Sequence, residues 1–426
     1  MNFTVLPNLI ALGVLVAVFW AISRKATTER LYLWLTGWAL VLLHFVAQFF
    51  SAGNTSWDRA ADVIAVDLLV LAAVAFLISI VAAEFSLRRQ IVLALTIAVP
   101  AVAYSSATVW GVIYKPYYLV LIALGVLAAG ICCRGQLLRN KLRTVVALAL
   151  AAVAVWIMAG AVLRGNPELG TTFILAVLNL AIAFFYAMWY RRATTGVMTT
   201  VIGFSLWGLI FPIAVLLDKF APWFHPDGEA WNIPKYIVAV GMILTLFEDQ
   251  IQISKYHAYH DELTGLPNRR LLEDRLGQAL AHARRGGAKV AVLQLDLNRF
   301  KEVNDTYGHR VGDLALQEVA ARLATCVQPG DTVARSGGDE FTVVSRLADA
   351  RAAQELVVAM KLALSGPVFV EGMEIQTGLS IGVALYPDDG SDADQLHAAA
   401  DRAMYAVKRA TRTGQPYEVL TQALRP

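Results

Sequence analysis

Two carboxylate-bearing segments in the last third of the chain have the residue types that hold metal ions and phosphates. Asp296 follows the apolar segment KVAVLQL, and Asp339 and Glu340 follow Gly337 and Gly338 within ARSGGDEF. In proteins, Mg²⁺ typically binds one or two carboxylates together with the phosphates of a substrate. If the two segments lie side by side, their carboxylates predict a metal-dependent site for nucleotidyl transfer.

Glycines and cations near these carboxylates fit the same chemistry. The glycine pair leaves room for a phosphate close to the backbone and allows positive φ angles in the turn. Lys408 and Arg412 are four residues apart and therefore share one face of a predicted helix. Together with Lys301, they could neutralise a pyrophosphate leaving group. The alternative for Lys408 and Arg412 is an ordinary solvated helix face.

Strands and helices alternate around these motifs. The apolar patterns predict strands at 289–295 and 378–385, two strands around the turn at Gly337 and Gly338, and helices near 268–285, 311–326, 350–364 and 393–411. This alternation indicates a soluble α/β domain, a sheet covered by helices, over residues 260–426.

The first 247 residues have the composition of a membrane protein. The whole chain is 57% hydrophobic and 16% charged, against roughly 25% charged residues in soluble domains. Apolar runs close to the ~17–25 residues that cross a bilayer as a helix alternate with short polar links. They predict a multi-pass α-helical membrane domain with nine spans in a lipid bilayer, near 6–22, 31–51, 62–83, 91–113, 117–133, 144–163, 172–190, 198–217 and 233–248.

The charges in the links predict how this domain is oriented. Lys and Arg in short loops accumulate on the cytoplasmic side of a membrane. The first, third, fifth and seventh links carry eleven of them, whereas the even links carry five if Lys235 is included. The N-terminus is therefore predicted outside and the C-terminal domain in the cytoplasm. Residues 248–259 contain no proline or glycine and are predicted to continue the ninth span as a helical stalk.

Polar side chains inside the predicted spans are candidates for sensing a ligand. His44, Asp67 and Asn179 lie in the second, third and seventh spans. Ionisable groups are costly inside a bilayer and often mark functional sites. The alternative is that these side chains form hydrogen bonds between helices.

Four motifs occur in order along the soluble domain: HDELTGLPNRR at 260–270, SGGDEF at 336–341, LSIGVALYP at 379–387 and AMYAVK at 403–408. Their order and spacing over residues 257–412 resemble a GGDEF diguanylate cyclase. The resemblance implies a fold related to the palm of class III nucleotide cyclases. It also implies the condensation of two GTP into cyclic di-GMP with release of pyrophosphate, by two domains that each hold one GTP, and therefore a homodimer.

The resemblance also assigns roles to the carboxylates. Asp296, the backbone carbonyl of Leu297 and Asp339 match the positions that hold Mg²⁺ or Mn²⁺. Glu340 matches a further metal ligand or the proton acceptor. Either Asp339 or Glu340 could act as the base.

The nucleoside positions of the family match Asn304, His309 and Asp313, with Phe300 expected to pack beneath them. A carboxylate at 313 can accept from the N1 and N2 protons of guanine, which favours GTP over ATP. The sequence departs from the family pattern at two places. Asn298 replaces the second acidic residue after the first strand, and the tetrapeptide at 328–331 reads QPGD, so Gln328 replaces the arginine of the family's product-inhibition site.

These patterns predict a homodimeric sensor in a bacterial inner membrane, with diguanylate cyclase output under the control of an unidentified sensory ligand. The alternative is a membrane receptor or transporter whose GGDEF domain only binds GTP. The small net charge of +3 gives no indication of a nucleic-acid partner.

Overall fold

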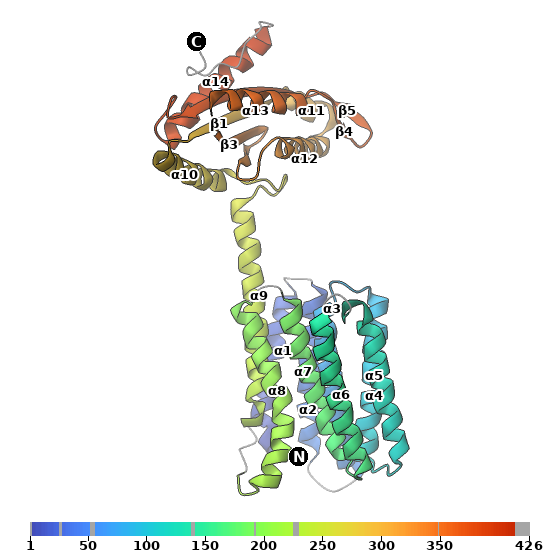
Figure 1. Cartoon of the computed structure of the whole chain (residues 1–426). Helices are drawn as coiled ribbons and strands as arrows, with labels where there is room; N and C mark the ends of the chain where they lie inside the picture. The colour runs from blue at the N-terminus through green and yellow to red at the C-terminus, as the bar shows by residue number, and fades with distance from the viewer. Residues whose placement is uncertain are drawn as a thin grey trace. The chain divides into compact units, whose positions relative to one another are not determined.

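The computed structural model describes residues 2–24, 28–51, 56–137, 141–190, 193–224, 230–347 and 349–413. Its contacts divide the chain into two units, Met1–Asp249 and Gln250–Pro426. The described strands all belong to the second unit, whereas the first is helical (Figure 1).

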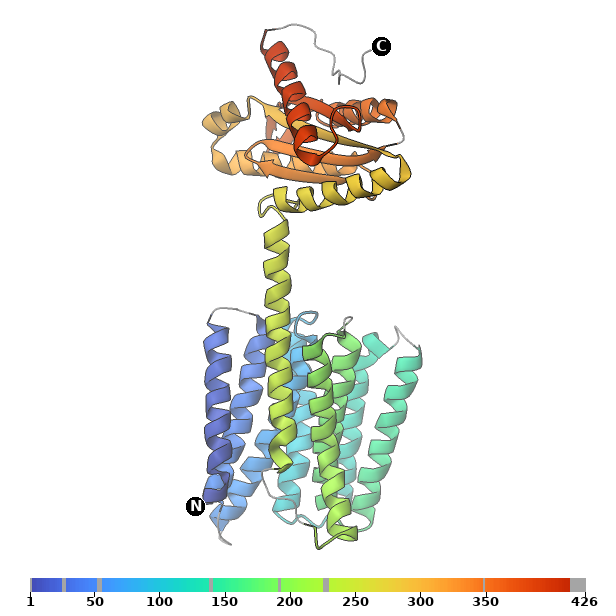
Figure 2. The same cartoon turned by 90° about the vertical axis from the view of Figure 1, so that its left-hand side faces the viewer.

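The first unit is a bundle of long helices packed side by side (Figures 1 and 2). It contains α1 (Leu6–Ser23), α2 (Glu29–Phe50), α3 (Ser56–Val81), α4 (Leu87–Val109), α5 (Lys115–Leu137), α6 (Lys141–Leu163), α7 (Glu168–Trp189), α8 (Thr195–Phe220) and the larger part of α9 (Ile233–Tyr259), with short 3-10 helices at Phe3–Val5 and Ala230–Asn232. Each predicted span overlaps one of these helices. Within the described residues, seven helices are long and apolar enough to cross a bilayer. The apolar stretches of α5 and α6, Lys115–Leu127 and Ala151–Leu163, are shorter.

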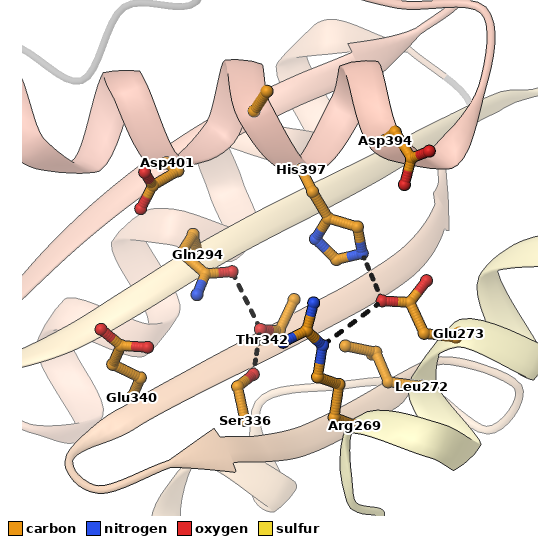
Figure 3. Close-up of a pocket in the computed structure, with 11 residues that line it drawn as sticks. Arg269, Leu272, Glu273, Gln294, Ser336, Glu340, Thr342, Asp394, His397 and Asp401 are labelled. Atoms are coloured by element: carbon orange, nitrogen blue, oxygen red, sulfur yellow. Dashed lines mark hydrogen bonds and ion pairs between the residues drawn. The ribbon is translucent and has the colours of Figure 1, made fainter.

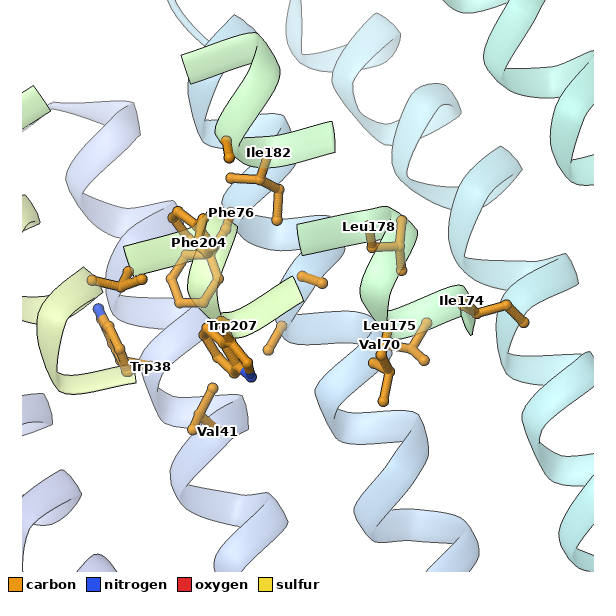
Figure 4. Packing of buried hydrophobic residues seen from close by; sticks show 14 of the residues in the cluster. Trp38, Val41, Val70, Phe76, Ile174, Leu175, Leu178, Ile182, Phe204 and Trp207 are labelled. Carbon is orange, nitrogen blue, oxygen red and sulfur yellow. The ribbon is translucent and has the colours of Figure 1, made fainter. Parts of the chain in front are cut away.

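Aromatic side chains fill the centre of the bundle (Figure 4). Trp38 stacks on Trp207 with ring centroids 6.5 Å apart. Phe76 meets Trp38 edge-on at 5.4 Å and Phe204 at 5.6 Å. Large rings bury much apolar surface per residue, so this cluster holds α2, α3 and α8 together.

Helices α8 and α9 approach each other closely through glycines. A Cβ atom at Gly203 would lie 2.7 Å from the backbone nitrogen of Val238, and one at Gly241 would lie 2.5 Å from that of Thr200. Small residues allow helix backbones to come this near. α9 then continues without a break to Tyr259, so the predicted stalk residues 248–259 are helical.

The second unit is built on a four-stranded antiparallel sheet with the order β2-β3-β1-β6. The central strand β1 (Lys289–Asn298) pairs with β3 (Glu340–Leu347) and β6 (Gly378–Tyr386), and β2 (Thr332–Gly337) pairs with β3. A separate small hairpin joins β4 (Val368–Val370) to β5 (Met373–Ile375).

Helices cover both faces of this sheet. The core on one face contains side chains of α10 (Arg269–Gly286) and α14 (Ala393–Thr413). The core on the other face contains side chains of α11 (Phe300–Tyr307), α12 (His309–Thr325) and α13 (Ala350–Ala363). The predicted α/β layers are confirmed, whereas α11 and the β4–β5 hairpin were not predicted.

Candidate functional site

The two carboxylate-bearing segments lie side by side, as the sequence predicted. In the antiparallel pair of β1 and β3, Asp296 lies opposite Glu340. The backbone N–H of Leu297 donates to the Asp339 carbonyl at 3.2 Å. The end of β1 and the turn before β3 therefore bring three carboxylates together at one end of these two strands.

The glycine turn between β2 and β3 is held by an arginine that the sequence did not single out. Gly337 and Gly338 have φ angles of 152° and 54°, which other residues rarely adopt. Nε and Nη2 of Arg335 donate to the Gly338 carbonyl at 3.0 and 2.7 Å, and Nη1 donates to Asp261 Oδ1 at 2.9 Å. Arg335 thus ties the turn to the loop before α10.

Asp261 anchors this arginine. Burial pushes the pKa of its carboxyl upward, but hydrogen bonds from Arg335 and Thr264 outweigh burial and hold the pKa below its usual range. Asp261 also accepts from the backbone N–H of Thr264 at 2.9 Å, and Asn268 accepts from the N–H of Leu271 at 3.2 Å at the start of α10. Asp261 therefore holds its turn, and Asn268 caps the start of α10.

Asp296 is the buried centre of the carboxylate cluster. It is 4% exposed, and the Lys408 ammonium donates to its Oδ2 at 2.6 Å. Within the described residues, Oδ1 has no hydrogen-bond partner. Lys408 therefore belongs to the site and not to a freely solvated helix face. The side chain of Arg412 lies outside the described residues.

The neighbouring carboxylates repel one another. Burial, and then the charge of Asp296, raise the pKa of the Asp339 carboxyl. The pKa of Glu340 is raised by burial and by the charges of Asp296, Asp339 and Asp401. A cation placed among these groups would relieve the repulsion.

The arrangement fits a metal ion that the substrate helps to hold. No three His, Cys, Asp or Glu side chains of the described residues are grouped closely enough to hold an ion by themselves. Mg²⁺ commonly takes only one or two carboxylates and completes its shell with phosphates and water. Asp296 Oδ1, which has no hydrogen-bond partner among the described residues, and the repulsion at Asp339 and Glu340 are consistent with such a site.

The residues matched to nucleoside binding lie on α11 and α12. His309 and Asp313 are exposed in the first two turns of α12, and Asn304 on α11 is partly buried. A Cβ atom at Gly312 would lie 1.9 Å from Asn304 Oδ1, so the small residue makes room for that amide. Phe300 is 6% exposed and packs in the core, as expected for a residue beneath the site, whereas Lys301 is exposed.

At the two places where the sequence departs from the family pattern, Asn298 and Asp331 hold the local structure. Asn298 Oδ1 accepts from the Ser380 hydroxyl at 2.7 Å and so links β1 to β6. Asp331 accepts from the backbone N–H groups of Gln328 at 3.1 Å and Arg346 at 3.2 Å. The Asp331 carboxylate is therefore engaged in holding its own turn.

A family model described as "Diguanylate cyclase, GGDEF domain" matches residues 258–414. The C-terminal domain belongs to the GGDEF family. The bifunctional diguanylate cyclase/cyclic di-GMP phosphodiesterase MucR of Pseudomonas aeruginosa is 46% identical over 157 residues, which are 37% of this chain and 23% of MucR. The diguanylate cyclase TpbB of the same organism is 39% identical over 167 residues, which are 39% of this chain and 38% of TpbB.

The GGDEF domain of PA1120 (YfiN or TpbB) from Pseudomonas aeruginosa, known from a crystal structure, has 40% sequence identity to the matched part of this chain. The match covers 34% of this chain and 92% of that one, with a TM-score of 0.34. This chain spans less than two fifths of the length of MucR and TpbB, and the similarity is to their GGDEF portion.

A polar hollow of about 410 Å³ lies beside Glu340 in the GGDEF domain, between the sheet, α10 and α14 (Figure 3). Along its floor, Thr342 Oγ1 donates to Gln294 Oε1 at 2.9 Å and lies 2.6 Å from the Ser336 hydroxyl. The imidazole of His397 and charged side chains also line it: Arg269, Glu273, Asp394 and Asp401. The hollow was not predicted, because its residues come from segments that lie far apart in the sequence.

The predicted sensor residues are separate from one another in the helical unit. Within the described residues, no hydrogen bond or ion pair joins His44, Asp67 and Asn179. Their contacts are His44 Nδ1 with the Ala65 carbonyl (2.8 Å), Asp67 with the Ser106 hydroxyl (2.7 Å) and Asn179 Nδ2 with the Leu175 carbonyl (2.8 Å). The contacts of His44 and Asp67 agree with the alternative of hydrogen bonds between helices, and their sensory role stays a prediction.

Proposed function

We propose that this protein is a diguanylate cyclase that condenses two GTP into cyclic di-GMP and releases two pyrophosphates. The observation that carries the proposal is the carboxylate cluster of the GGDEF domain. Buried Asp296 lies opposite Glu340, beside the glycine turn and within 2.6 Å of the Lys408 ammonium. None of the matched carboxylate positions is lost, which favours catalysis over the alternative of a domain that only binds GTP.

Asp296, the Leu297 carbonyl, Asp339 and Glu340 would hold Mg²⁺ or Mn²⁺. The ion would supply positive charge to the α-phosphate and the leaving pyrophosphate. Lys408, together with Lys301 and Arg412, would bind the pyrophosphate.

Glu340 or Asp339 would take the proton of the attacking 3′-hydroxyl. A carboxylate whose pKa is raised toward neutrality is a better proton acceptor. The hydroxyl oxygen forms a bond to the α-phosphorus, and the bond from that phosphorus to the pyrophosphate oxygen breaks. Asn304, His309 and Asp313 would hold the nucleoside, with the Asp313 carboxylate selecting guanine.

The attacking hydroxyl belongs to a second GTP, so turnover requires a homodimer. Exposed apolar residues on α9 suggest how two copies associate. Val240, Phe247 and Ile251 are 52%, 60% and 51% exposed, and with Leu244 they follow a heptad spacing. Such spacing is typical of paired helices in a left-handed coiled coil.

The helical unit would place the protein in a bacterial inner membrane, with the N-terminus outside and the GGDEF domain in the cytoplasm. Seven long apolar helices support this placement, and the bias of Lys and Arg among the links supports the orientation. In this location, the bundle would control the cyclase in response to a ligand.

The proposal is tested by the products of the full-length protein, purified in lipid nanodiscs and supplied with GTP and Mg²⁺. Mass spectrometry should detect cyclic di-GMP with the wild type. It should detect none with Asp339→Ala/Glu340→Ala, although this variant should remain folded and bind GTP. The exposed carboxylate variant Glu374→Ala, on β5, should retain wild-type activity. Normal activity in the double variant would refute the assignment.

A further inference from the structure

The helical unit buries a lysine at the start of α9. Lys235 is 8% exposed, and α9 begins short of the level at which α8 ends (Figure 2). The ammonium donates to Asn232 Oδ1 at 2.6 Å. Two aromatic rings also lie near it, with centroids 4.6 Å away at Phe45 and 5.8 Å away at Trp207.

This ammonium has no counter-charge in the described part of the chain. The ion pairs that involve lysine there are Lys289–Asp388 and Lys408–Asp296. An amide oxygen and two ring faces compensate only partly for the loss of water around a buried charge. A cation left in this state inside a helical bundle is a candidate for binding an anion.

The surroundings of Lys235 define which anion would fit. His44 is 5% exposed, and its ring lies against that of Phe45, with centroids 4.9 Å apart. One buried ammonium balances one negative charge, so a monoanion fits better than a phosphate. The rings of Phe45 and Trp207, which lie close to the ammonium, would contact the apolar part of the ligand.

We propose that a monocarboxylate with an apolar body binds in the helical bundle at Lys235, and that it is the input of the cyclase proposed above. The carboxylate would accept a charge-assisted hydrogen bond from the ammonium. Lys235 and Asn232 lie at the beginning of α9, which runs unbroken to Tyr259, directly before the first GGDEF motif. Binding would therefore act on the helix that enters the cyclase domain.

The probe is sodium benzoate, added to the full-length protein in nanodiscs. Saturable binding of radiolabelled benzoate should be displaced by hexanoate, but not by chloride or by neutral benzamide. Benzoate should also raise the melting temperature reported by tryptophan fluorescence and change the rate of cyclic di-GMP formation. Lys235→Met should weaken binding by about tenfold or more, whereas Lys219→Met, at an exposed lysine of α8, should bind as the wild type does.

Each alternative gives a distinct result. Absence of saturable binding to the wild type, equal displacement by chloride, or unchanged binding in Lys235→Met would overturn the proposal. Residues 225–229 lie outside the described part of the chain and include Asp227 and Glu229. If Asp227→Asn/Glu229→Gln binds benzoate and the wild type does not, the chain supplies its own carboxylate and the proposal is wrong.

Binding and melting do not depend on catalysis, and the wild-type binding assay does not depend on whether Lys235→Met folds. Saturable benzoate binding without any cyclic di-GMP formation would refute the proposed cyclase activity and the role of the ligand as its input, but not the site. An active cyclase that fails to bind benzoate would refute the site alone.

Discussion

Replacing Lys408 with methionine should destabilise the GGDEF domain when no metal is bound. The ammonium lies 2.6 Å from Asp296 Oδ2, and the other oxygen of this carboxylate has no partner in the described residues. Asp296 is 4% exposed, so water cannot replace the ammonium easily. The variant therefore leaves a buried carboxylate without a counter-charge.

The size of the effect follows from the burial of the pair. Removing one partner of a fully buried ion pair costs about 3–5 kcal/mol. The Lys408 side chain is 25% exposed, and solvent screening reduces the expected loss to roughly 2–3 kcal/mol. For a domain of this size, 1 kcal/mol changes the melting temperature by about 2–4 °C. The melting temperature should therefore fall by about 4–12 °C.

The assay is thermal unfolding of the fragment 250–426, followed by circular dichroism in EDTA and then in Mg²⁺. Mg²⁺ should restore part of the loss in Lys408→Met, because the ion supplies the missing positive charge. Asp296→Asn/Lys408→Met removes both charges and should melt closer to the wild type than Lys408→Met does. Lys361→Met, at an exposed lysine of α13, is the control. A melting temperature within about 1 °C of the wild type for Lys408→Met, or a double variant as unstable as the single one, would refute the reasoning.

Three further predictions concern the turn, feedback and coupling. Arg335→Ala should lower cyclic di-GMP formation by about tenfold or more without unfolding the domain, because the Gly338 carbonyl and Asp261 lose a shared charged donor. An unchanged rate would show that the glycine turn keeps its conformation without Arg335. Cyclic di-GMP should inhibit the wild type weakly and Gln328→Arg more strongly, and tight wild-type inhibition that GTP cannot compete away would reveal a different product site. One residue inserted after Gln252 turns the following helix by about 100° and should change activity strongly, whereas about seven residues nearly restore its phase; equal activity in both would mean that coupling does not depend on helix phase.

The sequence patterns of single segments predicted the carboxylate cluster, which the pairing of two neighbouring strands creates. Asp296 ends an apolar strand, and Asp339 and Glu340 follow a glycine turn, so pairing of the two strands is enough to bring them together. The same reasoning missed α11, because the breaks on either side of it depend on positive φ angles at Arg299 and Gly308. Hydrophobic periodicity does not report such angles.

Contacts between segments that lie far apart in the chain could not be predicted from the sequence. Arg335 and Asp261 are 74 residues apart, and nothing in their local patterns indicates that they pair. Lys235 was predicted at the edge of the ninth span, where a charge is expected. It is buried, and α9 begins short of the level at which α8 ends; both depend on how the helices pack.

The ratio of the two products formed from GTP tests the proposed reaction most directly. The purified full-length protein would be supplied with GTP labelled at the α-phosphate, and pyrophosphate and labelled cyclic di-GMP would be measured in the same sample. Condensation at the Asp296–Glu340 site should give two pyrophosphates for each cyclic di-GMP, and Asp339→Ala/Glu340→Ala should give neither. Release of GDP and inorganic phosphate, or stable GTP binding without either product, would contradict a diguanylate cyclase.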